Sequence, residues 1–299
     1  MGGKHASIFQ YFTLLTAGGC MSLLDEAKRL LNYYKIIPKK RLGQNFLVDE
    51  EALRKMISYA CISGRDVVLE VGAGLGFLTE RLAENAARVI AVEIDGRLVK
   101  ALRKRLRGYS NITILHGDIL KIDIPHFNKV VSTPPYSISS PLQFWLLNKP
   151  FEEAILSFQK EFAKRLTAPV GSKDYGRLTV TTYYRADVEI LDGVPKESFW
   201  PSPKVDSLIV RLKPKYPPFR VEDEKIFLDV VRAIFTQKNR KLKNALLPFF
   251  GRFRLSKKEA VKLAERLPFH DKRPRELYPE EIGLIANEIT RELRKAGLL

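Results

Sequence analysis

The stretch VVLEVGAGLG, Val67 to Gly76, decides the fold of this chain. A short β-rich apolar run leads into three glycines, and a helical pattern follows to about Glu84. Glycines at such a turn let the backbone approach a ligand closely, and a helix that begins there presents free N–H groups. Domains that bind nicotinamide cofactors, flavins or S-adenosylmethionine all place glycine at the first βα turn. The Gly-x-Gly-x-Gly spacing here, with a glycine at position 74 in the middle, departs from the Gly-x-Gly-x-x-Gly dinucleotide pattern.

Strand-like runs and helical segments alternate on the C-terminal side of this stretch. Such alternation is typical of βαβ units and of a mostly parallel sheet. Seven runs are expected to form strands: residues 67–71, 88–94, 111–117, 128–132, 152–159, 177–191 and 207–214. We expect the last two to form an antiparallel pair that closes the sheet.

The pattern changes at KPKYPPFRVEDE, residues 213–224, where three prolines interrupt it. Beyond it the periodicity is helical throughout, over residues 225–237, 241–250, 256–267 and 279–297. We therefore expect one domain over residues 21–214 and a smaller all-helical domain over 215–299. From Val230 through Lys258 there are nine Lys or Arg and no acidic residue, which favours a phosphate-binding surface.

Composition narrows the class of protein. The 299 residues include 51 Lys and Arg against 34 Asp and Glu, a net charge of +17 that favours a polyanionic partner. Two cysteines and four scattered histidines predict neither a disulfide framework nor a metal site, and they favour a reducing, cytoplasmic compartment. No apolar run is long enough to span a membrane. We interpret residues 1–20 as a disordered extension or as the product of a start codon placed too far upstream, rather than as a signal peptide.

Polar residues follow the next strand-like runs at equivalent places. Glu93 ends the second run, 21 residues after Gly72, where a carboxylate can accept both hydroxyls of a ribose. Asp118 follows the third run and can accept from an adenine amine, or else cap a helix. TPPY, Thr133–Tyr136, follows the fourth run, and its two prolines require a rigid, non-regular loop. Ligands bind at the carboxyl edge of open α/β sheets, so we expect these loops to form one crevice for a nucleoside-like ligand.

The order of GAGLG, an acidic strand end, Gly-Asp and TPPY resembles the adenine-N6 methyltransferases. More narrowly, the chain resembles the KsgA family of small-subunit rRNA adenine dimethyltransferases. Five segments carry this resemblance in order: KRLGQNFLVD (Lys40–Asp49), TPPYSISSP (Thr133–Pro141), FQKE (Phe158–Glu161), YGRL (Tyr175–Leu178) and PSPKVDS (Pro201–Ser207). A weaker similarity covers TQKNRKLKN, residues 236–244.

The resemblance implies a Rossmann-like, S-adenosylmethionine-dependent methyltransferase fold with a seven-stranded, mostly parallel sheet and a smaller helical RNA-binding domain. It implies dimethylation of N6 of two adjacent adenosines in the 3′-terminal hairpin loop of small-subunit rRNA. The expected partner is therefore small-subunit rRNA within the immature small ribosomal subunit, with a role in subunit biogenesis. We expect a monomer that needs no metal.

Residue by residue, the resemblance implies three groups. The cofactor contacts are Asn45, Leu47, Gly72, Gly74, Glu93, Asp118 and Thr133. The catalytic residues are Thr133, Pro134 and Tyr136. The expected RNA contacts are Phe162, in a segment that resembles one of Erm-like proteins, and Lys238, Arg240, Lys241 and Lys243, in the basic run and the weaker TQKNRKLKN similarity. The family has Asn-Leu-Pro-Tyr where this chain has Thr-Pro-Pro-Tyr, and because threonine keeps a hydroxyl acceptor we expect a slower enzyme rather than an inactive one.

Other functions remain open from the sequence. An Erm-like methyltransferase of large-subunit rRNA and a DNA adenine-N6 methyltransferase share the same motifs, although PSPKVDS and the basic helices favour the small-subunit enzyme. A non-catalytic ribosome-assembly factor or RNA-binding protein would not need Glu93 and Asp118 at these spacings. A dinucleotide oxidoreductase leaves TPPY unexplained.

Overall fold

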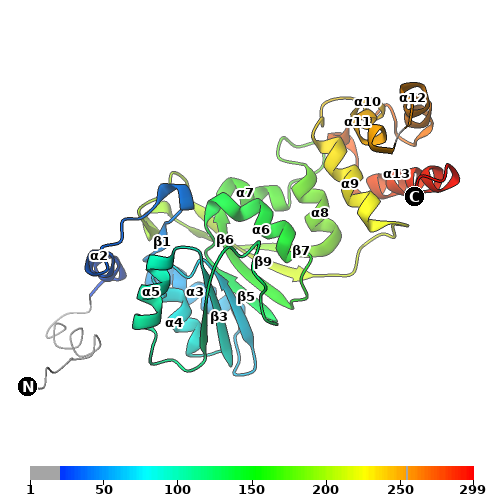
Figure 1. Ribbon diagram of the computed structural model, residues 1–299. Coiled ribbons are helices and arrows are strands. Elements are labelled where there is room, and N and C mark those ends of the chain that lie inside the picture. The colour runs from blue at the N-terminus through cyan, green and yellow to red at the C-terminus, as the bar shows by residue number, and fades with distance from the viewer. Residues whose placement is uncertain (1–20, 254) are drawn as a thin grey trace, which may run out of the picture. The chain divides into compact units, whose positions relative to one another are not determined.

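A computed structural model describes residues 21–253 and 255–299 of the chain (Figure 1). The expected N-terminal extension, residues 1–20, lies outside the described residues. The described chain divides into two compact units. The first comprises residues 21–160 and 189–212, and the second comprises residues 161–188 and 213–299. The predicted functional boundary between residues 214 and 215 stays a prediction, because a division by packing does not test which part binds RNA.

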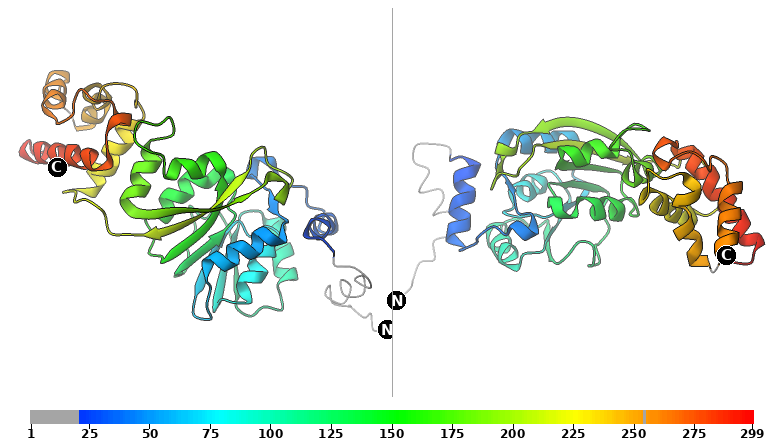
Figure 2. Two further views of the ribbon diagram at one scale, coloured as in Figure 1. Left: turned by 180° about the vertical axis from the view of Figure 1, so that it is seen from behind. Right: turned by 90° about the horizontal axis from the view of Figure 1, so that it is seen from above.

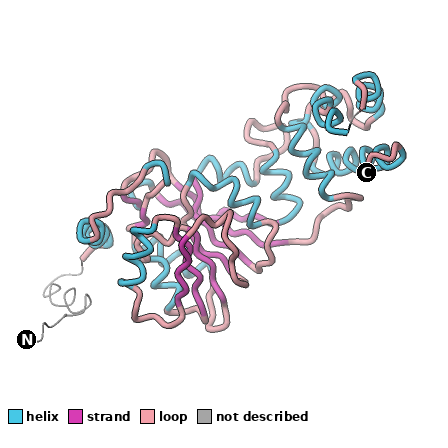
Figure 3. The backbone as a smooth tube through the Cα atoms, viewed as in Figure 1, coloured by secondary structure: helices cyan, strands magenta, loops and turns pink. Residues whose placement is uncertain are grey.

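A seven-stranded sheet runs through the described residues in the order β4-β3-β2-β5-β6-β9-β7 (Figure 3). The strands are β2 (Val67–Val71), β3 (Arg88–Glu93), β4 (Ile112–His116), β5 (Lys129–Ser132), β6 (Glu153–Gln159), β7 (Ala186–Val194) and β9 (Ser207–Pro214). The five strands β4, β3, β2, β5 and β6 pair in parallel, while β9 pairs with β6 in the antiparallel sense. This arrangement confirms the expected α/β class with a mostly parallel sheet.

Helices cover both faces of this sheet, with α3 and α6 on opposite sides (Figure 2). The helical elements of the first unit are α2 (Leu23–Tyr33), η1 (Lys40–Leu42), α3 (Glu50–Ala60), α4 (Phe77–Ala83), α5 (Gly96–Arg105), η2 (Tyr136–Ile138), α6 (Ser139–Leu146) and η3 (Lys196–Ser198). Ser22, Asp49 and Asp95 cap α2, α3 and α5 through their side-chain oxygens. The caps explain why these helices begin where they do, with their apolar stripes turned to the core.

A second, short sheet lies outside the predicted pattern. Strand β1 (Phe46–Leu47) pairs antiparallel with β8 (Phe199–Trp200), and Phe46, Leu47 and Phe199 join the buried core of the first unit. Strands of two residues carry no periodicity, so the sequence did not predict them. Their pairing brings the QNFL segment against a segment about 150 residues later in the chain.

The second unit is mostly helical and has its own apolar core. Its helical elements are α7 (Lys160–Leu166, which begins at the last residue of the first unit), α8 (Arg177–Arg185), α9 (Glu224–Phe235), α10 (Leu242–Ala245), α11 (Leu247–Phe250), η4 (Gly251–Phe253), α12 (Lys257–Arg266), η5 (Pro274–Glu276) and α13 (Pro279–Lys295). The predicted C-terminal helices are confirmed, although residues 241–250 form two short helices rather than one. No helix among the described residues is both long and apolar enough to cross a lipid bilayer.

The strand predicted over residues 177–191 is wrong in its first half. RLTVTTYYR forms α8, and only from Ala186 does the chain become a strand, β7. Val180 and Tyr184 lie four residues apart on one helix face and enter the core of the second unit, where the Tyr184 ring lies 4.7 Å from that of Phe227. Packing against α9 therefore overrides the β preference of the threonines and tyrosines.

Tyr175→Phe tests the core of the second unit. The Tyr175 side chain is buried, and its hydroxyl donates to the Leu277 carbonyl at 2.7 Å. Removing the donor leaves a buried carbonyl unpaired, so we expect the free energy of unfolding to fall by about 1–3 kcal/mol in urea titrations. Tyr183→Phe removes an exposed hydroxyl bonded to Glu280 and is the matched control, expected to change stability by less than about 0.5 kcal/mol. Equal losses in both variants would show that burial of the Tyr175 hydrogen bond adds nothing.

Candidate active site

Loops that follow four neighbouring parallel strands meet at one edge of the sheet. Residues 72–76 follow β2, residues 94–95 follow β3, which ends at Glu93, residues 117–118 follow β4 and residues 133–136 follow β5. The four strands are adjacent and parallel in the order β4-β3-β2-β5, so their carboxyl ends lie side by side. This is the edge at which open α/β sheets bind ligands.

The Glu93 carboxylate is the fixed centre of this edge. Its Oε2 accepts the Gly74 N–H at 2.9 Å and its Oε1 accepts the Asp95 N–H at 2.8 Å, in a side chain that is buried. Burial raises the pKa of Glu93, while the N–H donors from Asp95 and Gly74 oppose that rise. Each oxygen keeps acceptor capacity beyond these bonds, which suits hydroxyl donors such as those of a ribose.

Neighbouring side chains approach the backbone after β2 so closely that glycine is required at positions 72 and 74. Gly72 has φ of +80°, and a Cβ there would lie 2.9 Å from Pro135 Cδ. Gly74 has φ of +58°, and a Cβ there would lie 3.0 Å from a ring carbon of Phe46. The loop after β2 is therefore packed against both the TPPY loop and strand β1, with no room for a side chain at positions 72 and 74.

Two adjoining cavities open at this edge. The first has an empty volume of about 600 Å³, open to solvent, and it is lined by six of the seven predicted cofactor residues: Asn45, Leu47, Gly72, Gly74, Glu93 and Thr133. The seventh, Asp118, lines the second cavity of about 630 Å³, which shares Gly72, Glu93 and Pro135 with the first. The structure thus brings together all seven residues around two cavities that share Glu93 in their linings.

The TPPY loop is anchored at both ends. The hydroxyl of Ser132, at the end of β5, donates to the Val71 carbonyl at 2.6 Å and accepts the Val71 N–H at 3.2 Å. The Tyr136 hydroxyl forms a 2.6 Å hydrogen bond with Ser207, and its ring lies edge-on to Phe199 at 6.3 Å. Burial raises the pKa of Tyr136. Thr133 borders the first cavity, whereas Pro134 and Tyr136 line neither hollow.

Glu70 is a buried acid that lines the first cavity, and no role for it was predicted from the sequence. It lies in β2 at the start of EVGAGLG, it is 2% exposed, and its Oε2 has no hydrogen-bond partner among the described residues. Burial raises the pKa of Glu70 to about 8, and the nearby Glu93 adds to the rise. An acid in an otherwise apolar strand next to a glycine turn was the available signal in the sequence.

Gln44 connects the lining of the first cavity to Asp95. Gln44 lines the cavity and donates to Asp95 at 3.1 Å, while its side-chain oxygen accepts the Lys39 N–H at 2.7 Å. Arg97 binds Asp95 through both carboxylate oxygens, which holds the pKa of Asp95 well below its usual range. These contacts fasten the segment before β1 to the loop after β3.

The predicted RNA contacts lie in the second unit. Phe162 belongs to α7, and Lys238 donates to the carbonyls of Lys173 and Tyr175 at 2.7 and 3.3 Å. Lys241 and Lys243 lie 2.9 and 3.4 Å from Asp271, and Arg240 is exposed. The charge of the basic run, residues 230–258, is therefore partly neutralised by Asp271, which lies outside the run in the sequence. Contact of this run with RNA stays a prediction.

These residues fit the cofactor expected from the sequence, S-adenosylmethionine. Gly72 and Gly74 line the first cavity without side chains, and Glu93 offers acceptors for a nucleoside. Glu70 supplies a buried carboxyl group with an unpartnered oxygen among the described residues, in keeping with a ligand that carries an ammonium group. No group of three His, Cys, Asp or Glu is placed to hold a metal ion within residues 21–253 and 255–299.

Comparison with known proteins gives consistent matches over most of the chain. A family model described as ribosomal RNA adenine dimethylase matches residues 38–284. The chain is 45% identical over 262 residues to a probable ribosomal RNA small subunit methyltransferase A of Methanosarcina acetivorans, covering 87% of this chain and 96% of the relative.

Two solved structures resemble most of the chain. A dimethyladenosine transferase from Plasmodium falciparum superposes with a TM-score of 0.68 at 32% identity, covering 83% of this chain and 97% of that chain. The 23S rRNA methyltransferase ErmE superposes with a TM-score of 0.61 at 31% identity, covering 82% of this chain and 100% of that chain.

Glu70→Gln tests the buried acid through the pH dependence of stability. The pKa of Glu70 is about 8 in the folded chain and 4.5 for an ordinary glutamate. The folded state therefore binds the Glu70 proton more tightly than the unfolded state does. This difference stabilises the folded state fully below pH 4.5, and the stabilisation is lost as pH rises through 8. Between pH 5 and 8, we expect the free energy of unfolding of wild type to fall by up to about 4 kcal/mol relative to that of Glu70→Gln, in urea titrations without cofactor.

Glu84→Gln is the control for that measurement, since it removes an exposed carboxylate at the end of α4. Its stability profile should run parallel to that of wild type over the same pH range. A Glu70→Gln profile that also runs parallel to wild type would show that Glu70 ionises at ordinary pH and would refute its raised pKa.

Proposed function

The chain belongs to the ribosomal RNA adenine dimethylase family, and from that premise we propose that it transfers methyl groups from S-adenosylmethionine to N6 of adenosines in small-subunit rRNA. The observation that carries the proposal is the family match over residues 38–284, a range that includes the glycine loop, Glu93 and the TPPY loop. A relative that is 45% identical, 96% of which is covered, is named for the small subunit. In finer detail, the substrate proposed is two adjacent adenosines in the 3′-terminal hairpin loop of the immature subunit in the cytoplasm, each receiving two methyl groups.

The cofactor's place in this site follows from the chemistry of the lining residues. Glu93 is suited to the ribose hydroxyls, and Asp118, in the second cavity, to the amine of the adenine ring. Asn45, Leu47 and the glycines enclose the first cavity, where Glu70 lies next to the ribose side. When bound, S-adenosylmethionine supplies a sulfonium methyl group that is already a strong electrophile, so the chain needs no metal and no strong base.

The task left to the chain is to present the target nitrogen. The lone pair of an exocyclic adenine amine is conjugated into the ring, which makes the amine a poor nucleophile. Acceptors for its two N–H bonds favour a tetrahedral nitrogen, and the Thr133 hydroxyl and the Pro134 carbonyl are the proposed acceptors. Tyr136 is proposed to stack on the base, with its hydroxyl held by Ser207. An unpaired loop adenosine can reach such a site at low cost because it is already partly unstacked.

Two alternatives share parts of this site. ErmE resembles the chain in structure, yet the curated relative that is 45% identical is named for the small subunit. A non-catalytic assembly factor would have no need for a buried carboxylate ligated by two N–H groups at the edge of the cavity. The small-subunit dimethyltransferase therefore has the broadest support.

The proposal is tested by incubating the purified protein with labelled S-adenosylmethionine and small subunits that lack the modification. The rRNA is then digested and its nucleosides are separated by mass. The expected product is N6,N6-dimethyladenosine from the 3′-terminal hairpin. Absence of any labelled nucleoside, with cofactor and subunit binding both intact, would instead identify a non-catalytic assembly factor.

Thr133→Asn tests the role of the first TPPY residue. An amide at this position offers a carbonyl acceptor for the target amine, which a threonine hydroxyl replaces less well. One good acceptor contributes about 1–3 kcal/mol, so the single-turnover rate should rise between about 5- and 150-fold. Thr133→Val keeps the shape, removes the hydroxyl and should lower the rate. A rate that falls in Thr133→Asn as far as in Thr133→Val would contradict an acceptor role.

A further inference from the structure

A basic hollow lies on the first unit, and one of its residues, Arg97, contacts Asp95. It is lined by Tyr34, Arg97, Lys100, Arg103 and Lys104 and has an empty volume of about 750 Å³, open to solvent. Four of its five lining residues are cations, and none is an acid. We call these five residues the α5 face, since four of them belong to α5.

The charges on this face are mostly unpaired. Lys100, Arg103 and Lys104 are exposed and have no ion pair among the described residues; only Arg97 is held, by Asp95 at 2.6 Å. Helix α5, Gly96–Arg105, contains no acidic residue that could offset them. Like charges a helical turn apart repel one another, so such a face costs stability unless a polyanion neutralises it.

Helix α13 shows how this chain treats a charged helix that faces solvent. Its cations are matched by nearby carboxylates: Arg291 pairs with Glu222 at 2.6 Å, Arg294 lies 3.4 Å from the same carboxylate, and Lys295 pairs with Glu292 at 2.6 Å. Helix α5 differs from α13 because three of its cations have no carboxylate partner among the described residues. A cationic helix face without acids is typical of a surface that meets phosphates.

Aromatic rings stand beside these cations. Lys104 Nζ lies 6.0 Å from the centroid of the Tyr34 ring, and the Tyr33 ring meets Tyr34 edge-on at 4.9 Å. Tyr33 is 67% exposed, and the buried Tyr34 hydroxyl has no hydrogen-bond partner among the described residues. Cations interleaved with exposed aromatic rings are the combination that binds single-stranded nucleic acid.

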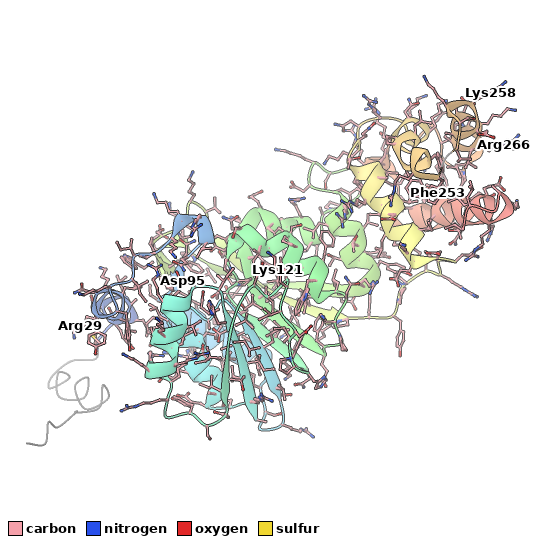
Figure 4. The ribbon with its side chains drawn as sticks, in the orientation of Figure 1. Arg29, Asp95, Lys121, Phe253, Lys258 and Arg266 are labelled. Atoms are coloured by element: carbon pink, nitrogen blue, oxygen red, sulfur yellow. The ribbon has the colours of Figure 1, made fainter. Side chains whose placement is uncertain are left out.

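The α5 face is joined to the site by a short chain of contacts. Arg97 binds Asp95, whose N–H is donated to Glu93 in the cofactor cavity (Asp95 and, on the neighbouring α2, Arg29 are labelled in Figure 4). Tyr33 and Tyr34 precede residue 38, where the family match begins, so part of the face lies outside it. Residues 1–20 include no acid that could neutralise the face.

We propose that the α5 face is a second RNA-binding surface, which holds the sugar-phosphate backbone of small-subunit rRNA next to the methylated loop. The proposal rests on the proposed function only in its choice of rRNA as the polyanion. Lys100, Arg103 and Lys104 contact phosphates, and Tyr33 stacks on an unpaired base. Such contacts carry no sequence information; they set the register of the RNA, so that the target adenosine reaches the TPPY loop.

The test measures binding of a fluorescent transcript of the 3′ domain of small-subunit rRNA by anisotropy, without cofactor, between about 50 and 200 mM salt. For Lys100→Gln/Lys104→Gln we expect binding about tenfold weaker at low salt, with the slope of log affinity against log salt smaller by about 1.5. Tyr33→Ala should weaken binding about fivefold or more with an unchanged slope, because stacking is not electrostatic.

Arg54→Gln/Lys55→Gln is the matched control. It also removes two cations from one helix of the first unit, the exposed Arg54 and the half-buried Lys55, but these pair with Glu51 and Asp192. It should change neither the affinity nor the slope. Equal losses in the two double variants, or none in Lys100→Gln/Lys104→Gln, would overturn the proposal. Since no methyl transfer is measured, a failure of the proposed reaction would not alter this readout, and thermal melting confirms that each variant is folded.

Discussion

Two backbone N–H groups bind the Glu93 carboxylate, and the rest of the site depends on this interaction. Gly74 and Asp95 donate to its two oxygens, so the loops after β2 and β3 are joined through one side chain before any ligand is present. Hydrogen bonds to a charged acceptor are about twice as strong as those between neutral groups. They oppose the rise in pKa that burial imposes on Glu93, and they fix the direction in which its free lone pairs point.

The TPPY loop is held in place by further contacts. Gly72 lies against Pro135, Ser132 ties the end of β5 to the end of β2, and Tyr136 is held by Ser207. Transfer of a methyl group from a reactive sulfonium calls mainly for placement of the nucleophile. A rigid set of loops supplies that placement, because the entropy of positioning is lost during folding and not during the reaction.

The sequence predicts those features that depend on local pattern. Apolar runs bounded by glycine or acidic residues predicted β2 to β6, and the spacing of Glu93 from Gly72 placed the edge of the sheet where the cavities lie. The sequence does not predict features that depend on tertiary contacts. Helix α8 packs Val180 and Tyr184 into the same core as α9, and the β1–β8 pair is too short to show a period. Asp271 reaches Lys241 across 30 residues, which no local pattern reveals. The sequence shows a glutamate at position 70, but it does not show that the side chain is buried.

Calorimetric titration of S-adenosylmethionine into wild type and Glu93→Gln asks whether this carboxylate holds the nucleoside of the cofactor. An amide at this position must turn a donor toward the N–H of Gly74 or Asp95, so it loses both an acceptor and the fixed geometry of the loop. We expect binding by wild type and an affinity at least about tenfold weaker in the folded variant. Equal affinities would show that Glu93 only joins two loops and that the cofactor is held elsewhere.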